Sequence, residues 1–406
     1  MTILEKASCR ESWQAFLNYK LERQHLDAGQ ERELRDFMER GAYLPLCQAW
    51  ARGEFPAQYP TKRVINKQGT KKKRIVYSFT GDEGIFLKFI AFQLFDFDDY
   101  FCDNCYAFRR GFGVKDALRR IRQQAGIGGM YCLKVDISNY FNSICVEKLL
   151  EKLAFVREQD EKAYEVFERI LSREQVWENG RLVQDRHGAM AGTPVSPFFA
   201  NVYLRDMDAH FQGQGILYFR YSDDILIFAD TESLLSLYQT QLYRMLDELS
   251  LSVNPEKLHV SRPGQPWEFL GFGYRNGEIG LSEMTVKKTK AKIRRKTETL
   301  RRWQRKKGLS GDKAAIGLIR AMNQKFYGAR KPSEEFQEVS AFTWSRWFLP
   351  NLTVDTDLKE IDTYFQEYIR YAVTGRHYKG NYRIRYEQLK AWGYRSLVHE
   401  FYSREQ

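Results

Sequence analysis

The sequence has no long hydrophobic run and little cysteine. No apolar stretch approaches the roughly 18 residues that a membrane-spanning helix needs, and residues 1–6 lack the apolar core of a signal peptide. Six cysteines in 406 residues are too few for a disulfide framework. The one close pair, Cys102 and Cys105, has no second Cys or His pair at zinc-site spacing. We therefore expect reduced thiols, no membrane partner and a cytoplasmic protein.

Internal repeats and low-complexity linkers are absent as well, so the chain reads as ordinary globular domains. A length of 406 residues exceeds one hydrophobic core and predicts two or three domains. Hydrophobic residues make up 43% and aromatic residues 15%, which is enough for a substantial core. The net charge of +12, with 24 Tyr and 28 Phe, indicates a polyanionic partner, most often nucleic acid. Simple basic solubility is the alternative.

The stretch 217–228 predicts a β-hairpin with two adjacent carboxylates at its tip. Aromatic and β-branched residues flank Ser222, Asp223 and Asp224 on both sides, a pattern typical of strand, tight turn and strand. Carboxylates are costly to bury without counter-charge, so such a pair requires a divalent cation or solvent. An ordinary solvated turn has the same composition, and both interpretations stay open on this stretch alone.

Another carboxylate follows a second predicted strand. Residues 131–135 predict this strand, and Asp136 lies at its end. A tight turn into a helix comes next, and Phe141, five residues after Asp136, places an aromatic side chain in that helix. The end of a buried strand is a recurrent position for a metal-binding carboxylate, so Asp136 is a candidate ligand. The alternative is a helix cap.

Two cation-rich segments are candidates for phosphate contacts. Residues 61–78 predict a β-hairpin with Gly at its turn, and its many cations, among them Lys73 and Arg74, suit triphosphate oxygens. Residues 106–113 form a Gly- and Arg-rich loop with Arg109, placed before a helix whose N-terminus can bind phosphate. A lysine-protected edge strand and a plain loop are the alternatives.

A Gly/Pro loop over 188–197 leads into a predicted helix, with Ser196 at the cap and Pro197 in the first turn. Such a loop, which contains Gly192, can support a base pair or a template backbone closely. A well-made helix start is the alternative. Further along, a turn carries the single lysine Lys257.

The last third of the chain is basic and then aromatic. Residues 269–272 predict a short apolar strand, and 285–307 predict a helix with twelve Lys and Arg residues. That density of cations suits a phosphate backbone, and binding should weaken steeply with salt. Residues 312–406 are helical and rich in aromatic side chains, most of them expected in the core and a few available to stack on bases.

Asp136, Asp223 and Asp224 place three carboxylates on two strand ends. Two-metal phosphoryl transfer requires such a set, because two divalent ions bridge the attacking hydroxyl, the phosphate and the leaving pyrophosphate. Each ion prefers hard oxygen ligands. The three carboxylates therefore predict a site for nucleotidyl transfer.

At this point the chain resembles the reverse transcriptases over roughly residues 60–280. The resemblance rests on the order and spacing of five palm motifs, which are Asp136 with Phe141, the loop from Gly192 to Asn201, Tyr221-Ser222-Asp223-Asp224, Lys257, and Phe269-Leu270-Gly271-Phe272. It is similar to bacterial group II intron, retron and diversity-generating enzymes, and most to the "unknown group" and abortive-infection, defence-associated ones. The intron enzymes usually have Gln where Ala191 stands, which puts the template contacts of that loop in doubt.

The resemblance implies roles for the candidate residues. Asp136, Asp223 and Asp224, with the Ile137 carbonyl, would bind two Mg²⁺ ions, with Mn²⁺ as a second option. Lys257 would neutralise or protonate the pyrophosphate. Phe141 would lie under the sugar and exclude a 2′-hydroxyl, which favours dNTPs, and the 269–272 strand would grip the primer end. The implied nucleotide and template contacts are Lys73, Arg74, Arg109, Gly192 and Ser196.

The implied fold is α+β, a right-hand polymerase with fingers, palm and thumb around an antiparallel palm sheet. We expect a helical N-terminal extension over 1–55, fingers and palm over 56–280, a basic helical thumb over 281–330 and a helical C-terminal extension over 331–406. The basic helix would follow the template–primer duplex and recognise its A-form shape.

The implied function is an RNA-directed DNA polymerase that uses dNTPs to copy an RNA template into DNA. The sequence has no His/Cys cluster of the intron endonuclease kind and no acidic constellation of the RNase H kind. We therefore expect a domesticated or antiphage defence role with an associated structured non-coding RNA, by analogy. A template-independent or protein-primed DNA polymerase of the abortive-infection type is one alternative. A non-catalytic RNA-binding scaffold is another, and a homo-oligomer stays open.

Overall fold

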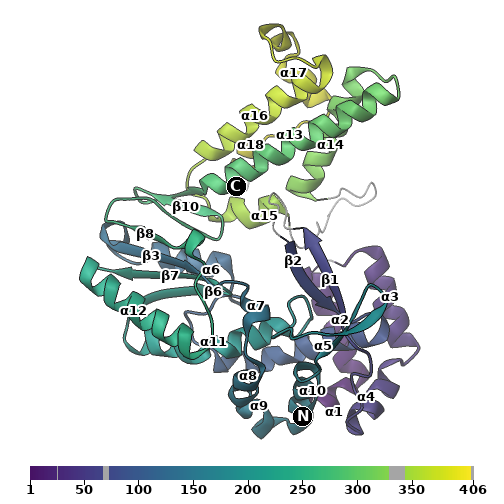
Figure 1. Cartoon of the computed structure of the whole chain (residues 1–406). Coiled ribbons are helices and arrows are strands. Elements are labelled where there is room, and N and C mark those ends of the chain that lie inside the picture. Colours follow the sequence, from purple (N-terminus) through teal and green to yellow (C-terminus); the bar gives the residue numbers. More distant parts are fainter. Residues whose placement is uncertain (25, 67–72, 329–342, 404–406) are drawn as a thin grey trace. The chain divides into compact units, whose positions relative to one another are not determined.

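The computed structural model describes residues 1–24, 26–66, 73–328 and 343–403. The chain divides into two compact units, Met1–Pro263 and Gly264–Gln406, which we describe in turn. The predicted α+β class with antiparallel sheets is confirmed (Figure 1). The boundary between the units falls inside the predicted 56–280 segment, and the finer division into four domains stays a prediction. Within the described residues, no helix combines the length and apolar character needed to cross a bilayer.

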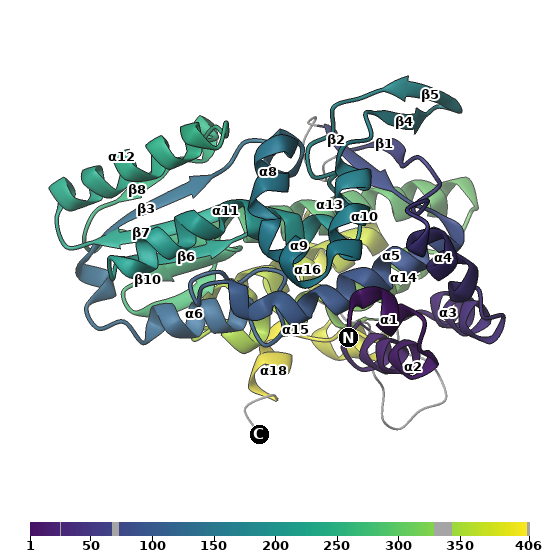
Figure 2. The same ribbon diagram turned by 90° about the horizontal axis from the view of Figure 1, so that it is seen from below.

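The predicted helical N-terminal segment is confirmed, and its helices α1, α2 and α4 pack on α5 (Gly81–Gln93) (Figure 2). Trp13 is fully buried there, with its ring centroid 4.1 Å from that of Phe89 and 5.4 Å from that of Tyr43. Burial of such aromatic side chains is a large part of what fixes these short helices, because helices of this length are marginal alone. The helices are α1 (Ile3–Ala7), α2 (Arg10–Tyr19), η1 (Lys20–Gln24), α3 (Ala28–Glu39) and α4 (Tyr43–Ala51).

The predicted basic hairpin is present as β1 (Thr61–Asn66) and β2 (Lys73–Ser78), paired antiparallel. Its turn, with Lys67, Lys71 and Lys72, lies outside the described residues. Two strands that the sequence did not predict, β4 (Gln175–Glu178) and β5 (Arg181–Gln184), extend it into a four-stranded sheet of order β2-β1-β4-β5. These strands are four residues long and largely exposed, so they carry little hydrophobic periodicity.

A second four-stranded antiparallel sheet, of order β6-β7-β3-β8, holds the candidate site. Its core strands are almost wholly buried and apolar, as the sequence predicted. Helix α11 (Ser196–Gly213) packs on β6, and α12 (Glu232–Glu248) packs on β7 and β3. The strands are β3 (Tyr131–Asp136), β6 (Leu217–Tyr221), β7 (Asp224–Ala229) and β8 (His259–Ser261). The other helices of this unit are η2 (Leu94–Tyr100), α6 (Val114–Arg122), η3 (Ile127–Gly129), α7 (Tyr140–Ser143), α8 (Val146–Lys152), α9 (Ala154–Gln159), α10 (Glu161–Leu171) and η4 (Pro255–Lys257).

The C-terminal unit opens with a three-stranded antiparallel sheet of β9 (Trp267–Phe269), β10 (Phe272–Arg275) and β11 (Glu278–Leu281). The prediction of one strand over 269–272 is wrong. Leu270 and Gly271 have φ of +54° and +89° and form the tight turn between β9 and β10. A side chain at Gly271 would also approach Thr285 Oγ1 at 3.0 Å, so the turn requires glycine.

Helices α13 (Glu283–Lys306), α14 (Gly311–Tyr327) and α16 (Thr356–Thr374) pack on one another in this unit. The predicted basic helix is α13, and it buries a narrow face of Val286, Thr289, Ile293 and Thr297. Its cations therefore remain on the wide outer face. The shorter elements are α15 (Trp344–Phe348), η5 (Leu349–Asn351), η6 (Lys379–Arg383), α17 (Tyr386–Ala391) and α18 (Leu397–Tyr402).

Candidate active site

Backbone pairing places the three predicted carboxylate residues at one end of the β6-β7-β3-β8 sheet. Asp136 is the last residue of β3 and pairs in register with Asp224, the first residue of β7. Ser222 has a φ of +61°, which closes the β6–β7 turn tightly. The Ile137 amide donates a hydrogen bond of 3.1 Å to the Asp223 carbonyl, which fixes the turn against the end of β3. Antiparallel register thus brings residues almost 90 positions apart in the sequence to one place.

A buried ion pair that the sequence analysis missed supports this turn from below. The Arg220 guanidinium donates to both carboxylate oxygens of Asp208 and, at 3.2 Å, to the Ser222 carbonyl. Both side chains are fully buried, and Arg220 also donates to Asn201 Oδ1 at 3.3 Å. A cation in the middle of the apolar strand 217–221 was the available signal. The pair positions the turn through its backbone.

The predicted lysine turn lies beside Asp136. The Asn254 amide donates to the Asp136 carbonyl at 2.8 Å, and the Ser138 amide donates to the Ser252 carbonyl at 2.8 Å. The Lys257 ammonium forms an ion pair with the Asp136 carboxylate. Lys257 is 44% exposed at its side chain, so solvent or a ligand can reach it.

Negative charge is poorly compensated among these carboxylates. Burial, with the neighbouring charges of Asp223 and Asp136, raises the pKa of Asp224 to about 6, against the opposing effect of Lys134. Burial, and next the charge of Asp136, also raises the pKa of Asp223, and Lys257 and Arg74 oppose that rise. The closest cation to Asp224, Lys134 Nζ, is 3.9 Å away. The cluster therefore favours an added positive charge.

The donor set fits a divalent cation. Asp224 Oδ1 is buried and has no hydrogen-bond partner among the described residues. Carboxylate oxygens are the ligands that Mg²⁺ and Mn²⁺ prefer. In the described part of the chain, no three Asp, Glu, His or Cys side chains stand grouped as a ready ligand set. The Lys257 ammonium occupies the Asp136 carboxylate instead, so a cation would have to replace it there.

Phe141 lies in α7, which begins four residues after Asp136 in the sequence. Its ring centroid is 5.6 Å from that of Tyr140 and 6.2 Å from that of Phe108. The 188–192 loop supports this helix, because the Ala189 amide donates to the Phe141 carbonyl at 2.8 Å. Gly188 has a φ of +53°, and a Cβ there would lie 2.6 Å from the same carbonyl oxygen. The loop glycine thus permits the close packing that holds Phe141.

The same loop is hydrogen-bonded to strand β2. The Tyr77 amide donates to the Ala191 carbonyl at 2.8 Å, and a Cβ at Gly192 would lie 3.0 Å from the Tyr77 carbonyl. Ser196 is the first residue of α11 and not its cap, which corrects the prediction. Its hydroxyl donates to the Thr193 carbonyl at 2.9 Å, because that carbonyl lies within reach before the helix begins.

The predicted phosphate-binding cations differ in their surroundings. Lys73 and Arg74 are exposed on β2, and the charge of Arg74 reaches Asp223. Arg109 is buried, and its guanidinium donates to the carbonyls of Asp98 at 3.0 Å and Cys102 at 2.7 Å. It also donates to the Cys105 carbonyl at 3.1 Å. Arg109 therefore orders its own loop, while β2 presents its cations outward.

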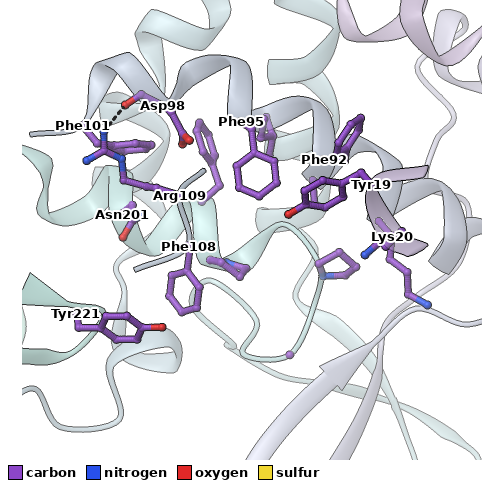
Figure 3. A pocket seen from close by; sticks show the side chains of 17 residues that line it. Tyr19, Lys20, Phe92, Phe95, Asp98, Phe101, Phe108, Arg109, Asn201 and Tyr221 are labelled. Carbon is purple, nitrogen blue, oxygen red and sulfur yellow. Dashed lines mark hydrogen bonds between the residues drawn. The ribbon is translucent and has the colours of Figure 1, made fainter. Parts of the chain in front are cut away.

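A pocket of about 540 Å³ adjoins the turn (Figure 3). Tyr19 and Lys20 of the N-terminal helices lie at one end and Tyr221 at the other. Burial, with the nearby charge of Lys88, lowers the pKa of Lys20 to about 8. The sequence analysis did not associate the N-terminal helices with the site. The rings that line the pocket are Tyr19, Phe92, Phe95, Phe101, Phe108, Phe198 and Tyr221.

Comparison with known proteins identifies the family of this chain. Residues 65–274, more than half of the chain, match the family model described as reverse transcriptase (RNA-dependent DNA polymerase). The chain belongs to this family. It is similar to the retron Ec86 reverse transcriptase of Escherichia coli, with 24% identity over 174 residues, 41% of this chain. The match spans 49% of that relative's length. All the predicted site residues lie within 65–274.

Three solved telomerase structures align with this chain at low sequence identity. The structure from Candida albicans, in complex with a fragment of telomeric RNA, gives 12% identity and a TM-score of 0.44, and the alignment covers 90% of this chain and 68% of that one. Apo telomerase from Candida tropicalis gives 11% identity and a TM-score of 0.45, and the alignment covers 82% of this chain and 67% of that one. The apo structure truncated from the C-terminal domain gives 12% identity and a TM-score of 0.42, and the alignment covers 55% of each chain.

Proposed function

We propose that this protein is an RNA-directed DNA polymerase, which adds dNTPs to a primer on an RNA template by two-metal nucleotidyl transfer. The observation that carries the proposal is the placement of Asp136, Asp223 and Asp224 at one end of the sheet, together with a buried Asp224 oxygen that has no hydrogen-bond partner among the described residues. Within a chain of the reverse transcriptase family, such a site suits Mg²⁺ and, as a second option, Mn²⁺.

Each residue near the carboxylates has a role in this proposal. Asp136, Asp223 and Asp224, with the Ile137 carbonyl, would hold the ions. Two bound ions would supply activation of the primer 3′-hydroxyl and stabilisation of the charge on the phosphate. Lys257 exchanges its ion pair with Asp136 for the leaving pyrophosphate, which it neutralises or protonates.

The nucleotide and template have separate contacts in the proposal. Lys73 and Arg74 bind the triphosphate, because they are exposed and the charge of Arg74 reaches Asp223. Phe141 excludes a 2′-hydroxyl and so favours dNTPs. Gly192 lines the aromatic pocket, where rings and lysines suit template bases and phosphates. Ser196 and Arg109 act by holding the backbone of their loops.

The decisive experiment is primer extension on an RNA template with the Asp223→Ala/Asp224→Ala variant. We expect loss of dNTP incorporation with the folded state retained. The matched control is Asp230→Ala, which removes an exposed carboxylate at the opposite end of β7. Full incorporation by the double variant would refute the assignment of these carboxylates to catalysis. Absence of incorporation by the parent protein, with RNA still bound, would leave a non-catalytic RNA-binding scaffold.

The finer proposal is a defence role in which an associated structured non-coding RNA is copied into DNA. Its support is the resemblance to abortive-infection and retron enzymes. Sequencing of the nucleic acid that copurifies with the protein tests it, since template, product and primer are obtained together. DNA complementary to one structured RNA supports the proposal. DNA without a template, or DNA joined to the protein, supports a template-independent or protein-primed polymerase instead.

A further inference from the structure

The chain carries a concentration of aromatic and cationic side chains far along the sequence from the carboxylates. Residues 376–386, which follow α16, contain three Tyr, three Arg and one Lys and no Asp or Glu. The segment belongs to the C-terminal unit and lies beside α17, in yellow in Figure 1. It is outside residues 65–274, which match the family model. The proposed polymerase function leaves this segment unexplained.

Two large rings of the segment are exposed to solvent. Tyr378 is 55% exposed and Tyr382 is 65% exposed, while Phe365 and Tyr394 in the same unit are buried. Tyr378 packs over Gly380, where a Cβ would lie 2.2 Å from the ring. Single exposed rings are common on protein surfaces, but two exposed rings four residues apart among cations offer stacking faces beside positive charge.

The backbone that presents these rings is well anchored. Asn381 is buried, accepts a hydrogen bond of 2.7 Å from Thr374 Oγ1 and donates one of 2.7 Å to the Arg376 carbonyl. Arg370 Nε donates to the Ile384 carbonyl at 3.0 Å, and its guanidinium lies 5.4 Å from the Tyr382 ring centroid. Little conformational entropy is lost when a ligand meets a surface that is already ordered.

The cations of the segment have no acidic partners. Arg376, Lys379, Arg383 and Arg385 are exposed, and none forms an ion pair within 4.0 Å in the described part of the chain. Elsewhere in the unit, by contrast, Lys359 pairs with an Asp at 2.9 Å. The one acidic neighbour in sequence is Glu387, just after the segment. An uncompensated group of cations between exposed rings matches an anion that also carries flat apolar faces.

We propose that residues 376–386 bind an unpaired stretch of nucleic acid. Tyr378 and Tyr382 stack on successive bases, and the four cations contact the phosphates. A duplex hides its base faces, so the segment selects single strands. Acidic peptides supply charge but no stacking faces, which makes them poorer ligands. This site holds a strand without taking part in the chemistry, so it stands apart from the proposed function.

The test is fluorescence anisotropy of the full-length protein with a labelled, unstructured 20-nucleotide RNA. We expect Tyr378→Ala/Tyr382→Ala to weaken binding by about ten-fold or more, from the typical strength of base–aromatic stacking. The matched control is Tyr378→Phe/Tyr382→Phe, which keeps both rings and should bind within about two-fold of the parent. The same DNA sequence is run in parallel, and the tighter of the two ligands identifies the sugar that the site prefers.

Three outcomes of the direct binding assay would overturn the proposal. They are unchanged RNA binding by the Ala variant, an equal loss by the Phe variant, and an equal loss for blunt duplex RNA. Competition by polyglutamate as strong as that by RNA would also overturn it, in favour of an acidic protein partner. Primer extension on a pre-annealed substrate should be unchanged in the Ala variant, which shows that the protein is folded. Asp223→Ala/Asp224→Ala should bind the RNA normally, so failure of either proposal is distinguishable.

Discussion

Two acidic regions border strand β6, and they compensate their charge in opposite ways. Asp208, beneath the strand, is fully buried and forms two hydrogen bonds with Arg220 and one of 3.0 Å with the Tyr218 hydroxyl. Asp224, at the turn, is also largely buried but has one oxygen without a hydrogen bond, and its closest cation is 3.9 Å away. A satisfied buried charge stabilises one arrangement of the chain. An unsatisfied one costs stability and is available to a ligand.

Asp208 is therefore a structural carboxylate, whereas Asp224 is a candidate for binding a ligand. Asp208 and Arg220 hold the Ser222 carbonyl and so fix the turn. The fixed turn keeps Asp223 and Asp224 near Asp136, although the negative charges of these carboxylates repel one another. Rigid support beneath a repulsive cluster is what a preorganised cation site needs.

The largest expected effect is on catalysis, from Asp136→Ala. Incorporation of dNTPs should fall by on the order of 10³-fold, because the ions lose one carboxylate ligand. Unfolding by urea should change little, since the ion pair of Asp136 is with a partly exposed lysine. A loss of activity that merely follows a loss of folded protein would place Asp136 with Asp208, among the structural carboxylates.

The next effect is on stability, from Asp208→Ala. The free energy of unfolding should fall by about 3–5 kcal/mol, because the Arg220 charge is left buried and unpaired. Replacing both partners, as Asp208→Leu/Arg220→Met, should recover most of that loss. Urea denaturation measures both variants. If the single variant unfolds like the parent protein, the described support of the turn is incorrect.

A smaller and opposite change is expected from Asp224→Asn. The pKa of Asp224 is about 6 in the folded protein, above its ordinary value, so the folded state holds the proton more tightly. The free energy of unfolding therefore falls as pH rises through 4 to 6, and the cost is fully present above pH 6. Without divalent ions, Asp224→Asn should be more stable than the parent protein by about 2 kcal/mol at pH 8.

Thermal and urea unfolding at two pH values check this sign. The gain should disappear near pH 3, where the carboxyl is mostly protonated in both the folded and the unfolded state. Addition of Mg²⁺ at pH 8 should stabilise the parent protein and not the variant. A variant that is less stable than the parent protein at pH 8 would show that Asp224 is satisfied like Asp208.

The smallest effect is on nucleotide choice, from Phe141→Ala. Discrimination between dNTPs and NTPs should fall by about ten-fold or more, because the ring no longer occludes the 2′-hydroxyl. Phe141→Tyr keeps the ring and should keep the discrimination. Single-nucleotide incorporation with matched dNTP and NTP measures the ratio. An alanine variant that accepts NTPs no better than the parent protein would remove Phe141 from the site.

Much of the candidate site was predictable because its signals are local. The strand that ends at Asp136 and the hairpin around Asp223 and Asp224 both follow from apolar runs that stop at carboxylates. The failures have physical reasons too. Strands β4 and β5 are short and exposed, so they lack the periodicity that identifies a strand. At 269–272 an apolar sequence conceals a turn that only the positive φ of Leu270 and Gly271 reveals.

The candidate ligands, the basic surfaces and the family resemblance were predictable because residue type and spacing along the chain encode them. Which charged side chains have a hydrogen-bonding or ionic partner depends instead on the tertiary structure. It paired Lys257 with Asp136, committed Arg109 to backbone carbonyls and placed Arg220 beneath the turn. It also brought Tyr19 to the pocket that adjoins the turn. Compensation of a charge depends on distance and burial, and both arise from contacts between residues far apart in the sequence.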